Sequence, residues 1–214
     1  VVNEDNRLIG QATVTDALDV IQQELAEDFS QSFGAGAEEN IFTPIKRSIY
    51  MRLPWMSINL LLAFIVSYTI AQFEESISAN ALLAALMPVV ALVGGNSGAQ
   101  SLAIVIRALA KNDVSDARVS EVILKQSLIG LVNGIIIGLI SATILFAGNL
   151  ETYAIPLGLA VLFNIFIGNF SGATIPLLLR RLGFDPALAS NIFLTLITDI
   201  VGFAGFLLAA LLLL

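Results

Sequence analysis

Long apolar runs dominate the last three quarters of the sequence and predict membrane-spanning helices. A helix needs about 20 apolar residues to cross the hydrocarbon core of a bilayer. The runs that meet this length cover roughly residues 55–73, 80–106, 122–147, 153–179 and 187–214. The pattern therefore predicts five spans. The second, third and fourth exceed the minimum length and should be tilted, broken or extended into the interface.

The basic residues predict how these spans are oriented. Lys and Arg are enriched in cytoplasmic loops and at the cytoplasmic ends of spans. After Arg7, all of them lie before the first span or close to two connections, second to third and fourth to fifth: Lys46, Arg47, Arg52, Arg107, Lys111, Arg118, Lys125, Arg180 and Arg181. The remaining connections carry none. With five spans, this alternation places the amino end in the cytoplasm and the carboxyl end outside.

The first 40 residues have the pattern of a cytoplasmic segment. Residues 1–14 read as strand, polar turn and strand. A helix follows, with Thr15 as its expected cap and with Leu18, Ile21, Leu25 and Phe29 at helical spacing. The helix should break at residues 32–37, and residues 42–52 should form an interfacial lead-in to the first span. The chain begins without Met, so we expect it to be a fragment of a longer protein.

The composition agrees with a membrane protein and excludes several kinds of chemistry. Only 13% of the residues are charged, whereas a soluble domain has about one quarter. The sequence has no Cys and no His, which excludes disulfides, thiolate nucleophiles, imidazole bases and the usual zinc ligands. We therefore expect no enzyme. The absence of a basic patch also predicts no nucleic-acid partner.

Asp199 is the one acidic residue well inside an apolar run. No Lys or Arg lies in its span to neutralise it. An aspartate at the centre of a spanning helix costs about 2.5–3.5 kcal/mol on insertion scales, and a functional role is the default interpretation. A transported cation would supply the missing positive charge. The alternative is a protonated Asp199 that bonds to Asn or Thr of another helix.

A proline, paired glycines and three polar side chains interrupt the second run between Pro88 and Gln100. The pattern predicts a broken helix whose backbone carbonyls, which are hard oxygen ligands, line a watery cavity. The alternative is tight helix packing through Gly and Ser. Packing does not require Asn96 or Gln100, which favours the pore lining. Asn191, two turns before Asp199 on a similar face, is expected in the same conduit.

Acidic residues also gather on the predicted cytoplasmic side. In the amino-terminal helix they share about half the circumference, where like charges repel unless a cation or a basic partner intervenes. These residues are Asp16, Asp19, Glu24, Glu27 and Asp28. Asp185 lies at the cytoplasmic mouth of the last span. The alternatives to a cation site are a solvated helix face and, for Asp185, helix capping.

The stretch Gly94-Gly95-Asn96-Ser97-Gly98-Ala99-Gln100 and the stretch from Thr198 to Phe203 resemble the two signature segments of the MgtE magnesium transporters. The resemblance covers essentially the whole chain. Residues 1–14 resemble the end of an α/β CBS domain, and residues 15–40 resemble the connecting, or plug, helix and its linker. Residues 41–214 would then form the ion-pore domain. The expected fold is an all-α, multi-pass protein of the cell membrane (the inner membrane if bacterial) with five transmembrane helices per subunit.

The resemblance also implies a mechanism. Two subunits would form a homodimer in which both copies of Asp199 hold a largely hydrated Mg²⁺, an ion that sheds water reluctantly and binds one or two carboxylates. Glycine carbonyls and side-chain amides would contact its waters at Gly94, Gly95, Gly202, Asn96 and Asn191. The acids of the connecting helix, facing Asp185, would bind cytoplasmic Mg²⁺ and close the pore. Mg²⁺ would thus be both transported and regulatory.

Other functions use the same residues. A carrier that couples cation movement to another ion needs the same site as a channel, and Mn²⁺, Co²⁺ or Zn²⁺ could replace Mg²⁺. Oxygen ligands without Cys or His favour Mg²⁺ or Mn²⁺. An intramembrane enzyme is disfavoured because Asp199 has no second buried acid as partner. A passive anchor would explain the hydrophobicity but neither Asp199 nor the Gly-Gly-Asn segment.

Overall fold

The computed structural model describes residues 7, 10–11, 13–34 and 39–214, and it leaves the side chains of residues 17, 21–26, 28 and 29 undescribed. Within this part of the chain all regular structure is helical. The strands predicted within residues 1–14 fall mostly outside the described residues. The predicted break after the first helix is confirmed, because α1 (Val14–Ser32) ends before Gly34, whose φ is +76°.

Five helices are long and apolar enough to cross a membrane, as predicted. They are α2 (Ile45–Ala71), α4 (Ala81–Ala110), α5 (Val119–Ala147), α6 (Glu151–Arg181) and α7 (Ser190–Leu213). The short helix α3 (Glu74–Ala79) and the 3₁₀ turn η1 (Asp116–Arg118) occupy two connections. The predicted lead-in at residues 42–52 is largely the start of α2 itself, which continues through Pro54.

The predicted interruption of the second span is wrong. α4 runs without a break from Ala81 to Ala110, through Pro88 and the paired glycines. A continuous helix pairs its backbone groups internally, which is the arrangement that the hydrocarbon core demands. The glycines serve close helix packing instead, which was the alternative interpretation.

Glycines allow α6 to approach α4 and α5 closely. A Cβ atom on Gly98 of α4 would lie 2.8 Å from the carbonyl oxygen of Gly168 on α6. A Cβ atom on Gly138 of α5 would lie 2.6 Å from the carbonyl oxygen of Gly158, also on α6. Small residues permit such backbone contact between membrane helices. They place α6 at the centre of the bundle, and it is the most buried of the five spans.

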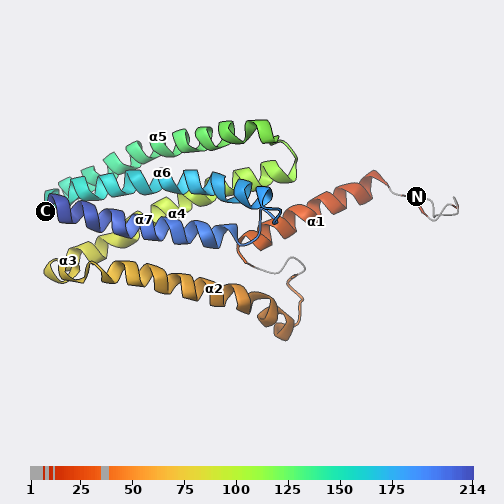
Figure 1. Ribbon diagram of the computed structural model, residues 1–214, viewed down its shortest axis with the longest axis horizontal. Coiled ribbons are helices and arrows are strands. Elements are labelled where there is room, and N and C mark those ends of the chain that lie inside the picture. The colour runs from red at the N-terminus through yellow and green to blue at the C-terminus, as the bar shows by residue number, and fades with distance from the viewer. Residues whose placement is uncertain (1–6, 8–9, 12, 35–38) are drawn as a thin grey trace.

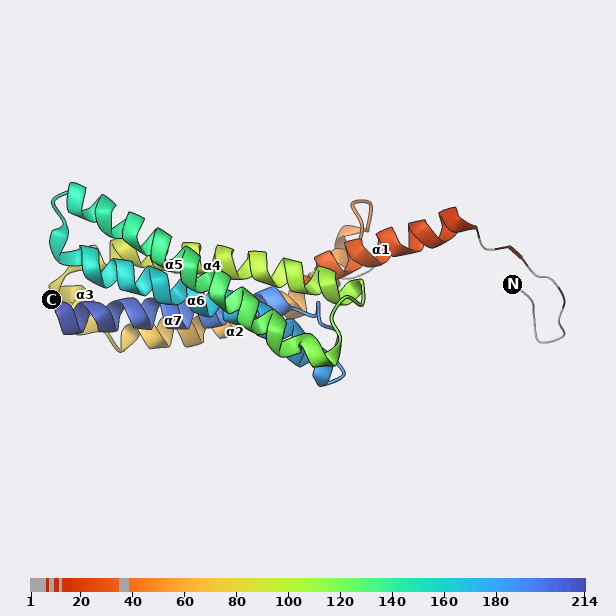
Figure 2. The ribbon, with the colours of Figure 1, turned by 90° about the horizontal axis from the view of Figure 1, so that it is seen from above.

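The bundle has two distinct ends (Figures 1 and 2). The end of α1, the start of α2 and the α4–α5 and α6–α7 connections lie at one end, while α3 and the carboxyl terminus lie at the other. The basic residues after Arg7 therefore share one end, as the alternation predicted. α1 projects beyond this end, and α2 lies along the edge of the bundle beside α7.

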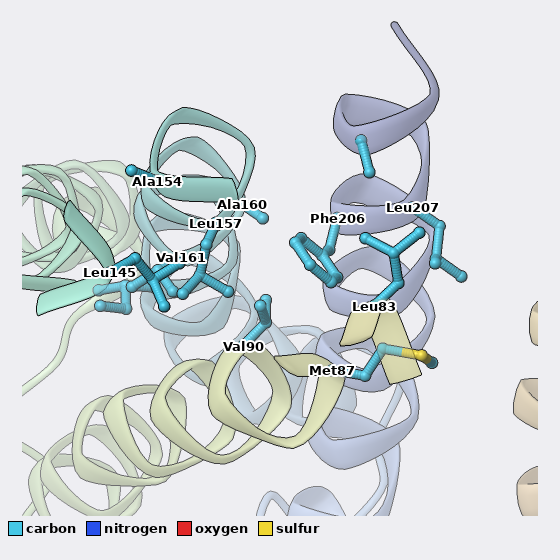
Figure 3. Close-up of a cluster of buried hydrophobic side chains, with 12 residues drawn as sticks. Leu83, Met87, Val90, Leu145, Ala154, Leu157, Ala160, Val161, Phe206 and Leu207 are labelled. Carbon is cyan, nitrogen blue, oxygen red and sulfur yellow. The ribbon is translucent and has the colours of Figure 1, made fainter. Parts of the chain in front are cut away.

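An apolar cluster joins α4, α6 and α7 in the half of the bundle near α3 (Figure 3). Val90 of α4, Val161 of α6 and Phe206 of α7 are each fully buried in it. This burial holds the three helices together in that half of the bundle. The polar residues described next lie on these same helices.

Candidate cation site

A cavity of about 510 Å³ lies between α4 and α7, and Phe33 at the end of α1 also contributes to its wall. The wall carries the side chains of Asn96, Asn191, Thr195 and Asp199. The three residues from α7 are four positions apart, so they share one face of the helix. The structure thus brings together four predicted site residues, Gly95, Asn96, Asn191 and Asp199.

The Asp199 carboxyl group is half-buried and has no partner among the described residues. No hydrogen bond or ion pair of the described chain involves it, and the two ion pairs there join Arg52 to Glu39 and Arg180 to Asp116. The hydroxyl groups of Thr195 and Thr198 donate to carbonyl oxygens of their own helix instead. An acid in this position is left to interact with whatever occupies the cavity.

Two of the predicted site residues lie elsewhere. Gly94 and Gly202 are buried and do not line the cavity. Both face Asn164 of α6, next to the part of α4 and α7 that lines the cavity. Gly94 and Gly202 therefore contribute to the packing of α4 and α7 against α6. The carbonyl role predicted for them came from the resemblance to the MgtE family. For Gly94 it also depended on a broken helix, whereas α4 is continuous.

Thr195 and Phe33 are cavity residues that the sequence analysis did not select. A signal was present for Thr195, because it lies midway between Asn191 and Asp199 at helical spacing. Phe33 could not be found in this way, because only the fold brings the end of α1 to α7. A second cavity of about 400 Å³ shares both residues and extends toward Arg52, Trp55 and Asn59 of α2.

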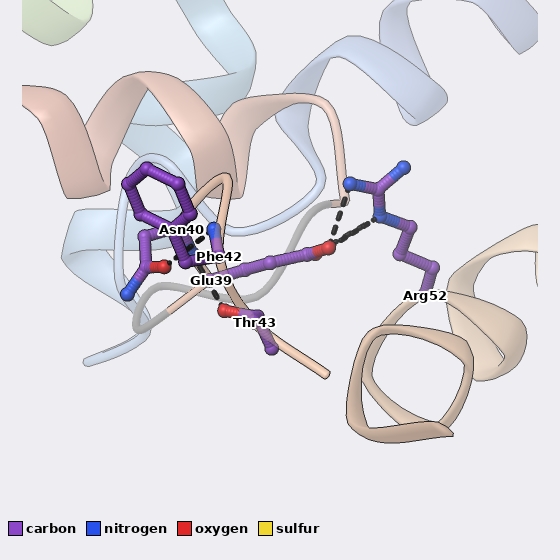
Figure 4. Close-up of polar contacts among 5 residues, drawn as sticks. All are labelled: Glu39, Asn40, Phe42, Thr43 and Arg52. Carbon is purple, nitrogen blue, oxygen red and sulfur yellow. Dashed lines mark hydrogen bonds and ion pairs between the residues drawn. The ribbon is translucent and has the colours of Figure 1, made fainter. Parts of the chain in front are cut away.

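Three contacts fasten the end of α1 beside the cavity. The backbone N–H of Ala189 donates to the carbonyl of Gln31 over 3.1 Å. The Cα of Gly34 packs against α2, since a Cβ there would lie 3.0 Å from the Cβ of Trp55. In the following linker the Arg52 Nε donates to both carboxylate oxygens of Glu39, each over 2.9 Å (Figure 4).

The acids predicted to sense cytoplasmic Mg²⁺ fall only partly within the described residues. Among those described, no three acidic side chains are placed to hold a metal ion together. Asp19 is exposed and Glu27 is half-buried, while the side chains of Glu24 and Asp28 lie outside the described part. Asp185 accepts a hydrogen bond of 2.8 Å from the backbone N–H of Ala187 within the α6–α7 connection. It does not cap α7, whose N-cap is Ala189, so the capping alternative is wrong.

Asp16 takes part in the cap of α1. The helix begins two residues earlier than predicted, and its cap is Thr13 rather than Thr15. The Thr13 hydroxyl accepts from the Asp16 N–H, and the Asp16 carboxylate accepts from the Thr13 N–H, which forms a capping box. These hydrogen bonds, chiefly the one from the Thr13 backbone, lower the pKa of Asp16.

Five membrane-length helices, two of which border a cavity that carries an acid and three further polar side chains, indicate a multi-pass membrane protein of the transport class. The sequence model of the MgtE family, described as a divalent cation transporter, matches residues 87–209. This chain belongs to that family. The matched segment contains every polar residue of the cavity wall between α4 and α7.

Similar proteins include three magnesium transporters named MgtE. The one from Enterococcus faecalis is 37% identical over 204 residues, which cover 94% of this chain and 44% of that protein. Those from Bacillus subtilis and Thermus thermophilus are 33% and 34% identical and are covered over 45% and 48% of their lengths. The chain thus spans about half the length of the curated relatives it matches. All three names denote transport rather than catalysis, in agreement with the expectation that the chain is not an enzyme.

Proposed function

We propose that this chain is the pore-forming part of a magnesium transporter that moves Mg²⁺ across the membrane into the cytoplasm. The observation that carries the proposal is the unpaired carboxyl group of Asp199, which shares a cavity wall with Asn96, Asn191 and Thr195. Residues 41–214 would be the pore domain, residues 15–40 the connecting helix with its linker, and residues 1–14 the end of a CBS domain. The magnesium transporters similar to this chain support Mg²⁺ as the cargo.

The chemistry of the cavity wall suits a hydrated Mg²⁺ ion. Mg²⁺ prefers six oxygen ligands in octahedral geometry and usually keeps several of its waters. Six waters at about 30 Å³ each occupy roughly 180 Å³, which the cavity of about 510 Å³ can contain. Asp199 supplies charge, while Asn96, Asn191 and Thr195 offer oxygen atoms to the waters.

Exposed polar side chains support a homodimer. In the single chain, the side-chain amides of Asn96 and Gln100 are exposed on the membrane-spanning helix α4. Hydrocarbon cannot satisfy their hydrogen bonds, and each unsatisfied group would cost several kcal/mol. A second copy that covers this face would remove the cost. It would also bring a second Asp199, so that two carboxylates balance the two positive charges of Mg²⁺.

Gating by cytoplasmic Mg²⁺ is the regulatory part of the proposal. The basic end of the bundle would face the cytoplasm, which places the amino terminus and α1 there. Mg²⁺ bound by the acids of α1 and by Asp185 would hold the end of α1 against the cavity. This part of the proposal is supported by Phe33, which lies at the end of α1 and also lines the cavity. Neutralising Asp16, Asp19, Glu27 and Asp28 together should leave the pore open at high internal Mg²⁺.

The test is Mg²⁺ entry into liposomes that contain the purified chain and an internal Mg²⁺-sensitive dye. With an inside-negative potential, the wild type should conduct, and Asp199→Asn and Asp199→Ala should abolish entry while the protein stays folded. Asp113→Asn is the matched control, because it removes one acid from an exposed connection outside the spans. Equal entry in the wild type and in both Asp199 variants would refute the site.

The ion-coupled carrier is the second candidate, since it would use the same cavity. Entry driven by the potential alone indicates a channel, whereas entry that also requires a proton or sodium gradient indicates a carrier. Adding Mn²⁺, Co²⁺ or Zn²⁺ outside the liposomes would rank the competing cargo ions. The polar side chains of the cavity wall offer oxygen ligands and no thiolate or imidazole, which predicts that Mn²⁺ competes better than Zn²⁺.

A further inference from the structure

Asn164 is a buried amide in the middle of α6, and only 1% of its surface is exposed. Its Nδ2 donates a hydrogen bond of 2.9 Å to the carbonyl oxygen of Val90 on α4. Its Oδ1 is buried and accepts no hydrogen bond from the residues that the structure describes. An unpaired buried acceptor is destabilising because it has lost its hydrogen bonds to water. An apolar side chain would avoid that cost, so the amide is a poor choice for packing alone.

Two glycines make room for this amide. A Cβ atom on Gly202 of α7 would lie 2.5 Å from the Asn164 Nδ2 and 3.0 Å from its Cγ. A Cβ atom on Gly94 of α4 would lie 2.5 Å from the same Cγ and closer still to Nδ2. Real Cβ atoms do not approach so closely. The carboxamide therefore fills the space that side chains of α4 and α7 would otherwise occupy.

The amide lies next to the cation cavity. Gly94 is followed in the chain by Gly95 and Asn96, which line the cavity. Gly202 lies three residues after Asp199, so it is on the same side of α7 but one turn further along. The carboxamide of Asn164 thus separates α4 and α7 one turn from Asp199.

We infer that Asn164 is a positioning residue for the cation site, which sets the separation of α4 and α7 and thereby the reach of Asp199 and Asn96 to one ion. It touches no cargo and acts only through the two helices. The inference rests on the proposed function of the cavity. The inference predicts that the combined size of the side chains at positions 164 and 202 controls the affinity of the site for Mg²⁺.

Size complementation tests the inference in the liposome assay. Gly202→Ala adds a methyl group against the amide, and we expect the half-saturating Mg²⁺ concentration to rise about tenfold or more, as expected for a displacement of a fraction of an ångström. Gly202→Ala combined with Asn164→Ala should return most of the affinity, because the methyl group gains the vacated space. Gly205→Ala is the matched control on α7, since a Cβ there meets nothing within 4 Å.

The sequence contains no cysteine, so spin labels give a readout that does not depend on transport. Labels on Val89→Cys of α4 and Leu208→Cys of α7, both exposed positions, report the helix separation. It should increase in Gly202→Ala, return in the double variant and stay unchanged in Gly205→Ala.

An unchanged label distance in Gly202→Ala would overturn the inference, whether or not the wild type conducts. So would a loss of affinity that the double variant fails to rescue, or a loss that simply follows the melting temperature across the variants. Failure of the wild type to conduct would instead count against the proposed function, and the label distances would still decide the role of Asn164.

Discussion

Gly98→Ala should strongly weaken the contact between α4 and α6. The added Cβ would lie 2.8 Å from the carbonyl oxygen of Gly168 and 2.8 Å from the Cδ1 of Leu194. The first neighbour is backbone and cannot turn aside, and Leu194 is itself fully buried. The two helices must therefore separate by several tenths of an ångström, which weakens the close backbone contact over the neighbouring turns.

The magnitude follows from two opposing terms. Overpacking of a well-packed interior costs about 1–3 kcal/mol, and replacing Gly by Ala in a helix returns about 1 kcal/mol. Gly95→Ala on the same helix receives the same return without the clash, because its Cβ meets only the Thr198 hydroxyl at 3.6 Å. The two variants should thus differ by about 1–3 kcal/mol, or roughly 5- to 150-fold in the unfolding equilibrium.

Reversible unfolding of the purified protein in mixed detergent micelles would measure this difference. Helix content reports the transition, and each variant is compared with the wild type at the same micelle composition. Gly98→Ala should unfold at a lower fraction of denaturing detergent than Gly95→Ala. Equal stability of the two variants would refute the close α4–α6 contact.

Three further predictions concern α1 and the basic end of the bundle. Gly34→Ala and Gly183→Ala should each lower the free energy of unfolding by about 1–2 kcal/mol, because both glycines have positive φ. Only Gly34→Ala should also shift the tryptophan emission, because a Cβ at this position would press on the single tryptophan, Trp55. Arg180→Gln should speed amide hydrogen exchange in the α4–α5 connection, because Arg180 donates two hydrogen bonds to that connection. The free energy of global unfolding should change by less than about 1 kcal/mol. Arg181→Gln is the control and should not speed this exchange. The hydrogen bonds of the Asp16 cap should stabilise α1 fully above pH 3.8, the ordinary pKa of an aspartate. This stabilisation should be lost only as the pH falls through the lower pKa that Asp16 has in the folded chain. An NMR titration of the Asp16 carboxylate would show the lowered pKa.

The polar positions at membrane depth could be selected from the sequence with partial success. Asp199, Asn96 and Asn191 were expected in one conduit, and they do line one cavity. Their cost in hydrocarbon is so large that composition alone marks them. Gly94 and Gly202 were given carbonyl roles, yet they face Asn164. A glycine beside a polar residue has the same pattern whether it opens a helix or makes room for a neighbour.

The number of spans, their shared basic end and the unpaired acid all follow from the chain read by itself, because length, charge and hydropathy in a bilayer are properties of each segment alone. The continuity of α4 and the insertion of Asn164 between two glycines could not be read in that way. They depend on which helix faces which, and that arrangement is set by backbone contacts such as Gly98 against Gly168. Contacts of this kind join residues about 70 positions apart in the chain, as the hydrogen bond from Asn164 to Val90 also does.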